Sequence, residues 1–413
     1  MTRLRVLPVL IALTGAVVVP ARAASSVPSI ETPPGGITKL LRDYSRAWVT
    51  HDASLLDRTL QPGGFRDEQR RAVRNASPVP FRTYDVSVTT HYSGNLASAR
   101  VRKLYPGKQV AAYEVTIRTA LDVEDTPSVG DGAFTFVRSK PDAKDAYDGW
   151  RLVSSSDMDV LAFFTSHYIW EDGPVTLLRS PHFLVLAHPD VARSLEAVTS
   201  VAEDAYARAA RFWPFPVKAR YVMIVPTTTA ELGGIVHDTA DLADFVAFVG
   251  SGVDETSGWE PGGPRLYIHL DHFRNYTPAG QIGILAHELN HAITRPVTGP
   301  HVPTWVDEGM ANVSGGLPAY GANAGPLPGA FPTDDEFVTG SLGDIVRHYD
   351  QAQVAIQVLV NEKGRAALAR FYEKLGTARI VPGNDEYYLG EFARATLGWS
   401  VDHWVAEWRK ALR

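Results

Sequence analysis

Apolar residues along this chain follow two different periodicities, and the change between them divides the sequence. From Ile37 onward they recur at steps of three and four positions, which indicates an amphipathic helix, and a second short helix is expected over residues 53–60. Alternating or continuously apolar runs bounded by turn residues then predict strands at residues 84–92, 97–104, 111–121, 132–138 and 150–154. Helices followed by consecutive strands predict an α+β domain over residues 37–157.

A second arrangement begins after an expected connector at residues 158–178. Expected strands cover residues 182–187, 219–225, 245–250 and 264–270, and expected helices cover residues 191–213 and 228–237. The later segments are helical only, and the last of them, residues 401–412, carries apolar residues at four-residue steps. Residues 179–413 are therefore expected to form a mixed sheet followed by a helical lobe, which keeps the whole chain in the α+β class.

The first 23 residues have the pattern of a cleaved export signal. A short basic start is followed by an uncharged apolar run at residues 6–20, and Ala21-Arg22-Ala23 has the small-x-small pattern of a cleavage site. The run is shorter than the roughly 20 residues that span a bilayer, although an N-terminal membrane anchor is the alternative. Residues 24–36 are rich in Pro and Ser and predict a linker. The mature chain is expected outside the cytoplasm, secreted or otherwise extracytoplasmic, without a membrane span.

Composition narrows the partners and the chemistry. The formal net charge is −6, and it becomes more negative once the three arginines of the signal segment are removed. An acidic balance argues against nucleic acid or an anionic membrane as the main partner. The chain has no Cys, which excludes disulfides and thiolate ligands. Any metal site must therefore be built from His, Asp and Glu.

The most informative segment for chemistry is HELNH at residues 287–291. Thr277 followed by Pro is a good helix start, and the apolar stripe after it continues to about Thr294. On such a helix His287 and His291 point the same way, one turn apart, and can ligate one Zn²⁺. Glu288 is rotated by about 100° and can instead serve as general base towards a metal-activated water.

A zinc site of this kind needs a third protein ligand and an open fourth position. Glu308 comes seventeen residues after His291, on a second helix expected to begin near Pro303 and to end near Val313. An acid on a helix one hairpin away can complete a site of two histidines and one glutamate. The prediction is one Zn²⁺ held by His287, His291 and Glu308.

These two helices together resemble the gluzincins, the metallopeptidases that include thermolysin and the leukotriene-hydrolase-type aminopeptidases. The resemblance covers roughly residues 180–413 and rests on HExxH followed by WxxEGxA at residues 305–311. It implies a hydrolase that cleaves peptide or protein substrates, with the three zinc ligands named above and Glu288 as general base.

The resemblance also implies roles around the metal. A transition-state donor is expected at Tyr349, as the residue opening a later helix, with His348 as its rival. Asn312, four residues after Glu308, is expected to support a His ligand where thermolysin has Asp. An edge strand before the metal helix is expected to pair with extended substrate; this role is assigned to Tyr267, Ile268 and His269.

The sequence departs from the family in two further ways. The ligand spacing is shorter by two than in the aminopeptidases, and the GxMEN segment that anchors a free amino terminus there is absent. Endopeptidase and other exopeptidase specificities therefore stay open. His237, His269 and His272 are interpreted as ordinary packed or surface histidines.

Residues 37–157 resemble the cone-shaped superfamily of nuclear transport factor and ketosteroid isomerase, on element order and on the closing strand DGWRL at residues 148–152. No acid/base pair supports catalysis there, so a structural or contact role is expected. Two alternatives to an active peptidase remain. One is a zinc-stabilised binding protein without activity, and the other is a small-ligand binder acting through the N-terminal domain.

Overall fold

The computed structural model describes residues 33–89, 94–139, 144–161, 163–236, 246–250, 252–254, 260–299, 301–378 and 385–413. The fold is mixed α+β, as predicted. The expected signal segment, most of the expected linker and His237 lie outside the described residues. Within those residues, no helix combines the length and the apolar character needed to cross a bilayer.

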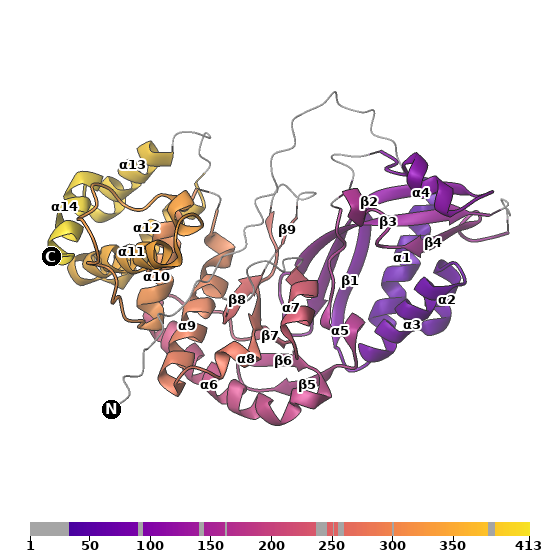
Figure 1. Ribbon diagram of the computed structural model, residues 1–413, viewed down its shortest axis with the longest axis horizontal. Helices are drawn as coiled ribbons and strands as arrows, with labels where there is room; N and C mark the ends of the chain where they lie inside the picture. Colours follow the sequence, from indigo (N-terminus) through magenta and orange to yellow (C-terminus); the bar gives the residue numbers. More distant parts are fainter. Residues whose placement is uncertain are drawn as a thin grey trace.

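The N-terminal unit is a curled four-stranded antiparallel sheet with three helices on one face (Figure 1). The helices are α1 (Gly35–Thr50), α2 (Ala53–Thr59) and α3 (Gly64–Asn75). The sheet order is β1 (Phe81–Val88), β2 (Gln109–Leu121), β3 (Ser128–Arg138) and β4 (Trp150–Ser154). The first two predicted helices and the predicted strand at residues 150–154 are confirmed. The charged helix α3 was not predicted, because it buries only Gln69, Ala72 and Val73.

Aromatic side chains fill the inside of this unit. Trp48 stacks on Tyr84 with ring centroids 4.7 Å apart, and Tyr44 lies edge-on to Phe134 at 6.0 Å. Trp170 belongs to the short helix α5 (Ile169–Asp172) in the expected connector, yet it is fully buried in the same core. This part of the connector therefore belongs to the N-terminal core.

The strand predicted at residues 97–104 is wrong, because the chain forms helix α4 (Ala99–Leu104) there. The side chain of Ser98 accepts a hydrogen bond from the backbone N–H of Val101 at 3.3 Å and caps this helix. Only Val101 of the helix is buried. A short helix with a single buried residue has no helical repeat of apolar residues. The alternation of apolar and polar residues at 97–104 therefore does not indicate a strand here.

The second sheet is mixed, as predicted, and has five strands in the order β5-β6-β7-β11-β8, of which β5 was not predicted. Strands β6 (Phe183–Ala187), β7 (Tyr221–Val225) and β11 (Arg265–Ile268) run parallel, while β5 (Thr176–Arg179) and β8 (Ala247–Gly250) are antiparallel at the two ends. The intervening elements are α6 (Ala192–Phe212), α7 (Thr229–Val236), the hairpin β9 (Val253–Asp254) with β10 (Glu260–Pro261), and, after β11, α8 (Leu270–Phe273).

Both faces of this second sheet are buried. Phe183, Val185 and Met223 point into a core that includes residues of α6 and of the later helix α9 (Pro278–Thr294). Leu184 and Val222, which alternate with them, join the core of the N-terminal unit. Strands buried on both faces are expected to be continuously apolar, as β6 and β7 are. The N-terminal unit thus covers one face of the second sheet, and α6 and α9 cover the other.

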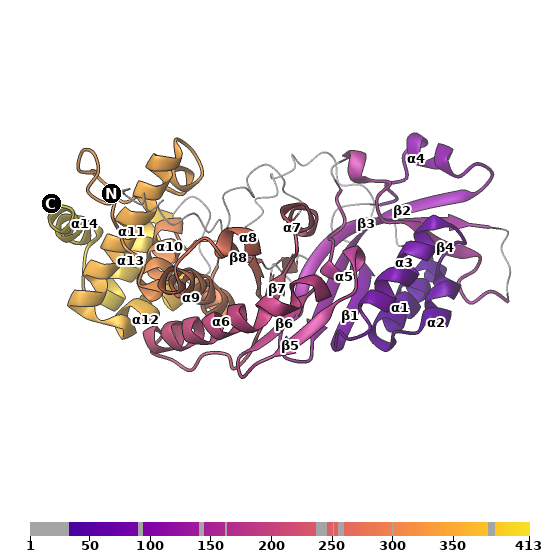
Figure 2. The ribbon, with the colours of Figure 1, turned by 60° about the horizontal axis from the view of Figure 1, so that its bottom comes forward.

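A lobe of helices follows the second sheet, at the end of the molecule opposite to the N-terminal unit (Figures 1 and 2). After α9 it comprises α10 (Thr304–Gly315), α11 (Leu342–Lys363), α12 (Arg365–Gly376), α13 (Asp385–Leu397) and α14 (Val401–Ala411). Tyr349 does not open α11, contrary to the prediction. The side chain of Ser341 caps this helix by accepting from the N–H of Asp344, so Tyr349 lies about two turns inside it.

A buried ion pair joins the two sheets. Arg265 of β11 donates from Nε and from one terminal nitrogen to Glu124, both at 2.8 Å, and the same terminal nitrogen contacts the carbonyl oxygen of Thr119 at 3.0 Å. Burial disfavours the guanidinium charge, but Glu124 more than compensates and raises the pKa of Arg265. Because both side chains are almost completely enclosed, neither charge can exchange its partner for water.

We predict that Glu124→Gln destabilises the protein by about 3–5 kcal/mol, since it leaves the Arg265 charge buried without a counter-charge. The matched control is Asp122→Asn, two residues away, whose ion pair with Arg179 is about half exposed. The control should cost no more than about 1 kcal/mol. Denaturant unfolding of both variants measures the difference, and equal midpoints would contradict the role assigned to the buried pair.

Candidate metal centre

Helix α9 carries both histidines, and its start is set by local sequence as predicted. The side chain of Thr277 accepts from the N–H of Gly280 at 3.2 Å, and Pro278 follows at the first helical position. His287 and His291 are both buried, one turn apart on this helix. Their burial comes from α6, β8 and α10, which pack around α9.

Two glycines let α10 approach its neighbours closely. A Cβ atom on Gly315 would lie 2.6 Å from the carbonyl oxygen of Gly283 in α9, and one on Gly309 would lie 2.5 Å from the carbonyl oxygen of Ala352 in α11. Any side chain at these positions would push the helices apart. The contact at Gly315 holds α10 against α9, the helix that carries the two histidines, and Glu308 lies on α10.

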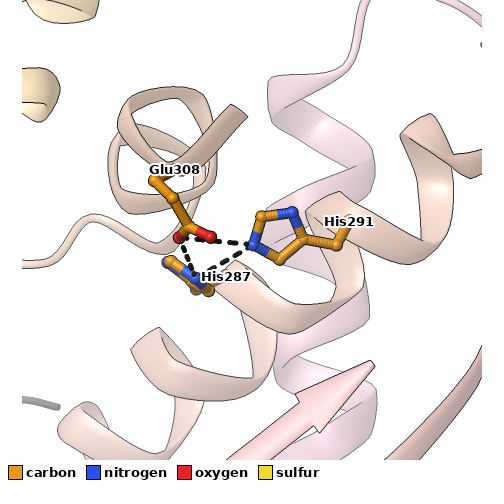
Figure 3. A group of neighbouring side chains, drawn as sticks. All are labelled: His287, His291 and Glu308. Carbon is orange, nitrogen blue, oxygen red and sulfur yellow. Dashed lines mark hydrogen bonds and ion pairs between the residues drawn. The ribbon is translucent and has the colours of Figure 1, made fainter. Parts of the chain in front are cut away.

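The structure brings the three predicted ligands together (Figure 3). Nε2 of His287 lies 3.1 Å from Nε2 of His291 and 3.3 Å from Oε2 of Glu308. Nε2 of His291 lies 3.6 Å from Oε2 of Glu308, so these three atoms form a triangle of possible ligand atoms. Ligand atoms on one tetrahedral Zn²⁺ are about 3.3 Å apart, given bonds of about 2.0–2.1 Å. The three side chains therefore already have the spacing of a metal site.

The unsatisfied groups at this triangle also fit a cation. Glu308 is completely buried, and neither of its carboxylate oxygens receives a hydrogen bond from the described residues. Burial alone would raise the pKa of Glu308, but His291 and His287 hold it below its usual value. A buried carboxylate without donors is costly, and a cation between the three side chains removes that cost. His287, His291 and Glu308 can hold a metal ion.

An outer pair of side chains orients the two imidazoles. Nδ1 of His287 donates to Oδ1 of Asn312 at 2.8 Å, and the amide nitrogen of Asn312 lies 3.4 Å from the carbonyl oxygen of Tyr349. Asn312 is thus where the resemblance implied. Nδ1 of His291 lies 3.2 Å from Oδ2 of Asp307. In both rings Nε2 remains directed at the metal position.

Asp307 is a site residue that the sequence reasoning missed. It directly precedes the predicted ligand Glu308, and consecutive helical residues point about 100° apart. Helical spacing alone therefore gives no sign that both carboxylates reach the same centre. In the structure the close approach of α9 and α10 lets Glu308 reach the Nε2 side of His291 while Asp307 reaches the Nδ1 side.

Glu288 lies beside the triangle without being part of it. Its Oε1 is 4.0 Å from Nε2 of His287, and its Oε2 is buried without a hydrogen-bond partner in the described residues. Burial raises the pKa of Glu288 to about 7, opposed by His287 and His291 and by the backbone N–H of Val249 in β8. A carboxyl group with such a pKa can both take up and release a proton near neutral pH.

The two candidate donors on α11 are placed differently. Tyr349 is buried, and burial together with the charges of Glu308 and Glu288 raises the pKa of its phenol. Its hydroxyl therefore stays protonated in the field of these two carboxylates. His348 instead donates from Nδ1 to the carbonyl oxygen of Glu336 at 2.8 Å. That contact holds its ring on the segment before α11, so the structure does not place His348 with the metal ligands.

The expected substrate strand requires a correction. Tyr267 and Ile268 belong to β11, which is hydrogen-bonded to β7 on one side and β8 on the other. His269 caps α8, and its Nε2 lies 2.6 Å from the hydroxyl of Thr229. The end of the described sheet is β8. The sequence showed a strand shortly before the metal helix, but not that it inserts between β7 and β8.

No protein-family model matches this chain, and no curated protein sequence matches it. The likeness to gluzincins therefore rests on the motif residues alone.

We predict that the purified protein binds about one divalent metal ion and that His291→Ala weakens this binding by more than the roughly 10–100-fold expected for loss of an outer partner. Metal content after dialysis and competition with a chromophoric chelator measure the effect. His403→Ala removes an exposed histidine of α14 and should leave binding unchanged. Equal metal affinity in the two variants would contradict the site.

Proposed function

We propose that this protein is an exported zinc-dependent peptidase of the gluzincin type. One observation carries the proposal: His287, His291 and Glu308 converge at metal-ligand spacing, with Glu288 buried next to them and outside the ligand set. Export itself remains a prediction from the first 23 residues.

Zinc is the metal that best suits these donors. Two imidazole nitrogens and one carboxylate form a ligand set that zinc accepts with an open fourth position, whereas Ca²⁺ and Mg²⁺ prefer oxygen ligands. His287, His291 and Glu308 would hold the ion. When bound, zinc supplies Lewis acidity, which polarises a peptide carbonyl and makes water easier to deprotonate.

Glu288 would move the proton in this reaction. Its unpartnered Oε2 is available to accept a proton from the attacking water. With a pKa raised by burial, the same carboxyl group can pass that proton to the departing amine nitrogen. A metal site that only stabilises the fold has no use for a fourth buried group of this kind. The presence of Glu288 therefore favours an enzyme over a binding protein without activity.

Tyr349 is the favoured donor to the oxyanion of the tetrahedral intermediate. Its phenol keeps its proton and lies within the field of Glu288 and Glu308, as a hydrogen-bond donor at this site requires. The alternative donor, His348, is hydrogen-bonded to the carbonyl oxygen of Glu336, which favours Tyr349 over it.

The edge of β8 is the proposed binding place for substrate backbone. The backbone N–H of Val249 in β8 interacts with Glu288, so β8 borders the site. An extended peptide can add to such an edge through main-chain hydrogen bonds. A peptide or protein substrate bound there would have its scissile bond near Glu288.

A small-ligand function of the N-terminal unit receives less support. The inside of its sheet is occupied by Tyr44, Trp48, Tyr84 and Phe134, and Trp170 packs against them. Its contacts with the second sheet favour the structural or contact role expected from the sequence.

Glu288→Gln should keep zinc and lose about 10²–10⁴-fold in peptide cleavage, because the variant retains the ligands but cannot accept the proton. Cleavage of a peptide library and metal content would be measured on the same preparation. Glu407→Gln, on the surface of α14, is the control and should behave as the unsubstituted protein. Full activity in Glu288→Gln would refute the mechanism. A zinc-loaded protein that cleaves no peptide, with or without chelator treatment, would favour the inactive binding protein.

A further inference from the structure

We infer that Tyr372 of helix α12 is a positioning residue for the metal centre, which it supports through Asp307 and His291. The inference rests on the metal site of the proposed function, but it does not depend on peptide cleavage. The three proposed ligands lie on α9 and α10. Tyr372 of α12 therefore connects the helical lobe to the metal centre through a residue outside the ligand motif.

A continuous chain of polar contacts carries the inference. The hydroxyl of Tyr372 lies 2.7 Å from that of Thr298 and donates to Oδ1 of Asp307 at 2.7 Å. The other carboxylate oxygen of Asp307 lies 3.2 Å from Nδ1 of His291, an ion-pair contact that does not have hydrogen-bond geometry. Nε2 of His291 belongs to the ligand triangle. The chain thus runs from α12 through α10 to α9 and ends at the metal position.

Each carboxylate oxygen of Asp307 faces a different partner. Oδ1 accepts from the Tyr372 hydroxyl, and Oδ2 lies on the Nδ1 side of His291. Burial and Asp307 raise the pKa of Tyr372, which therefore remains a donor. Arg295 adds a positive charge near Asp307 and Tyr372. With Asp307 on the Nδ1 side of the ring, Nε2 of His291 is directed at the metal position.

Backbone packing fixes the position of the Tyr372 hydroxyl. The last turn of α12 lies against the short helix η4 (Arg295–Val297), which follows α9. A Cβ atom on Gly376 would be 1.8 Å from the carbonyl oxygen of Val297, and one on Gly299 would be 2.1 Å from that of Gly376. Tyr372 is one turn before Gly376. This close contact sets the register of α12 on η4, and with it the reach of the phenol to Asp307.

Tyr372→Phe should raise the dissociation constant for zinc about 10-fold, within the roughly 10–100-fold range for loss of an outer partner. The substitution leaves Oδ1 of Asp307 buried without this donor. Zinc affinity is measured by competition with a chelator, and the visible spectrum of the Co²⁺-loaded protein reports on the ligand geometry, which should change. Tyr221→Phe is the matched control, because its hydroxyl in β7 is also buried but has no hydrogen-bond partner in the described residues. It should leave both readouts unchanged.

A double substitution tests whether Tyr372 acts through Asp307. In an Asp307→Asn background, Tyr372→Phe should change zinc affinity less than twofold, since the carboxylate it supports is already gone. The inference would be overturned if Tyr372→Phe and Tyr221→Phe had the same zinc affinity and the same Co²⁺ spectrum. It would also be overturned if the effects of Tyr372→Phe and Asp307→Asn on zinc affinity were fully additive. If Tyr372→Phe does not fold, Thr298→Val decides, with a smaller loss of affinity expected and unchanged affinity overturning the inference. Failure of the unsubstituted protein to bind zinc would instead refute the metal site itself.

Discussion

The contact between α9 and α10 is the constraint on which the rest of the structure depends. It buries the acids Glu288, Asp307 and Glu308 against the imidazoles of His287 and His291. Such an excess of buried acids is unfavourable unless a positive charge is added. Helices held apart by side chains could not create it, which is why Gly283 of α9 and Gly315 of α10 stand at this contact. The centre therefore combines close packing with a charge imbalance that a divalent cation corrects.

The second sheet supports this contact from one side and the helical lobe supports it from the other. α9 packs on the face of the sheet that β6 and β7 share with α6, and β8 brings Val249 to Glu288. On the far side, α11 packs against α10, and Tyr372 of α12 donates a hydrogen bond to Asp307 of α10. Each layer contributes a polar group near the metal position, so the geometry of the centre depends on the positions of all of them.

The parts of the site that could be predicted are those encoded within one helix. Helical spacing and the cap at Thr277 were enough to place His287, Glu288 and His291, and a second acid-bearing helix supplied Glu308. The other features depend on how elements meet in space. The sequence does not encode that β11 enters between β7 and β8, or that Asp307 shares a histidine with Glu308. For Tyr349, the family pattern outweighed a local signal, the cap at Ser341, that was present in the sequence.

The shared core of the N-terminal unit and the second sheet has a consequence for truncation. Removal of the N-terminal unit would uncover Leu184, Leu186, Val222 and Ile224 and would leave Arg265 without Glu124. The second sheet therefore needs the N-terminal unit to keep its apolar face and its buried charge covered.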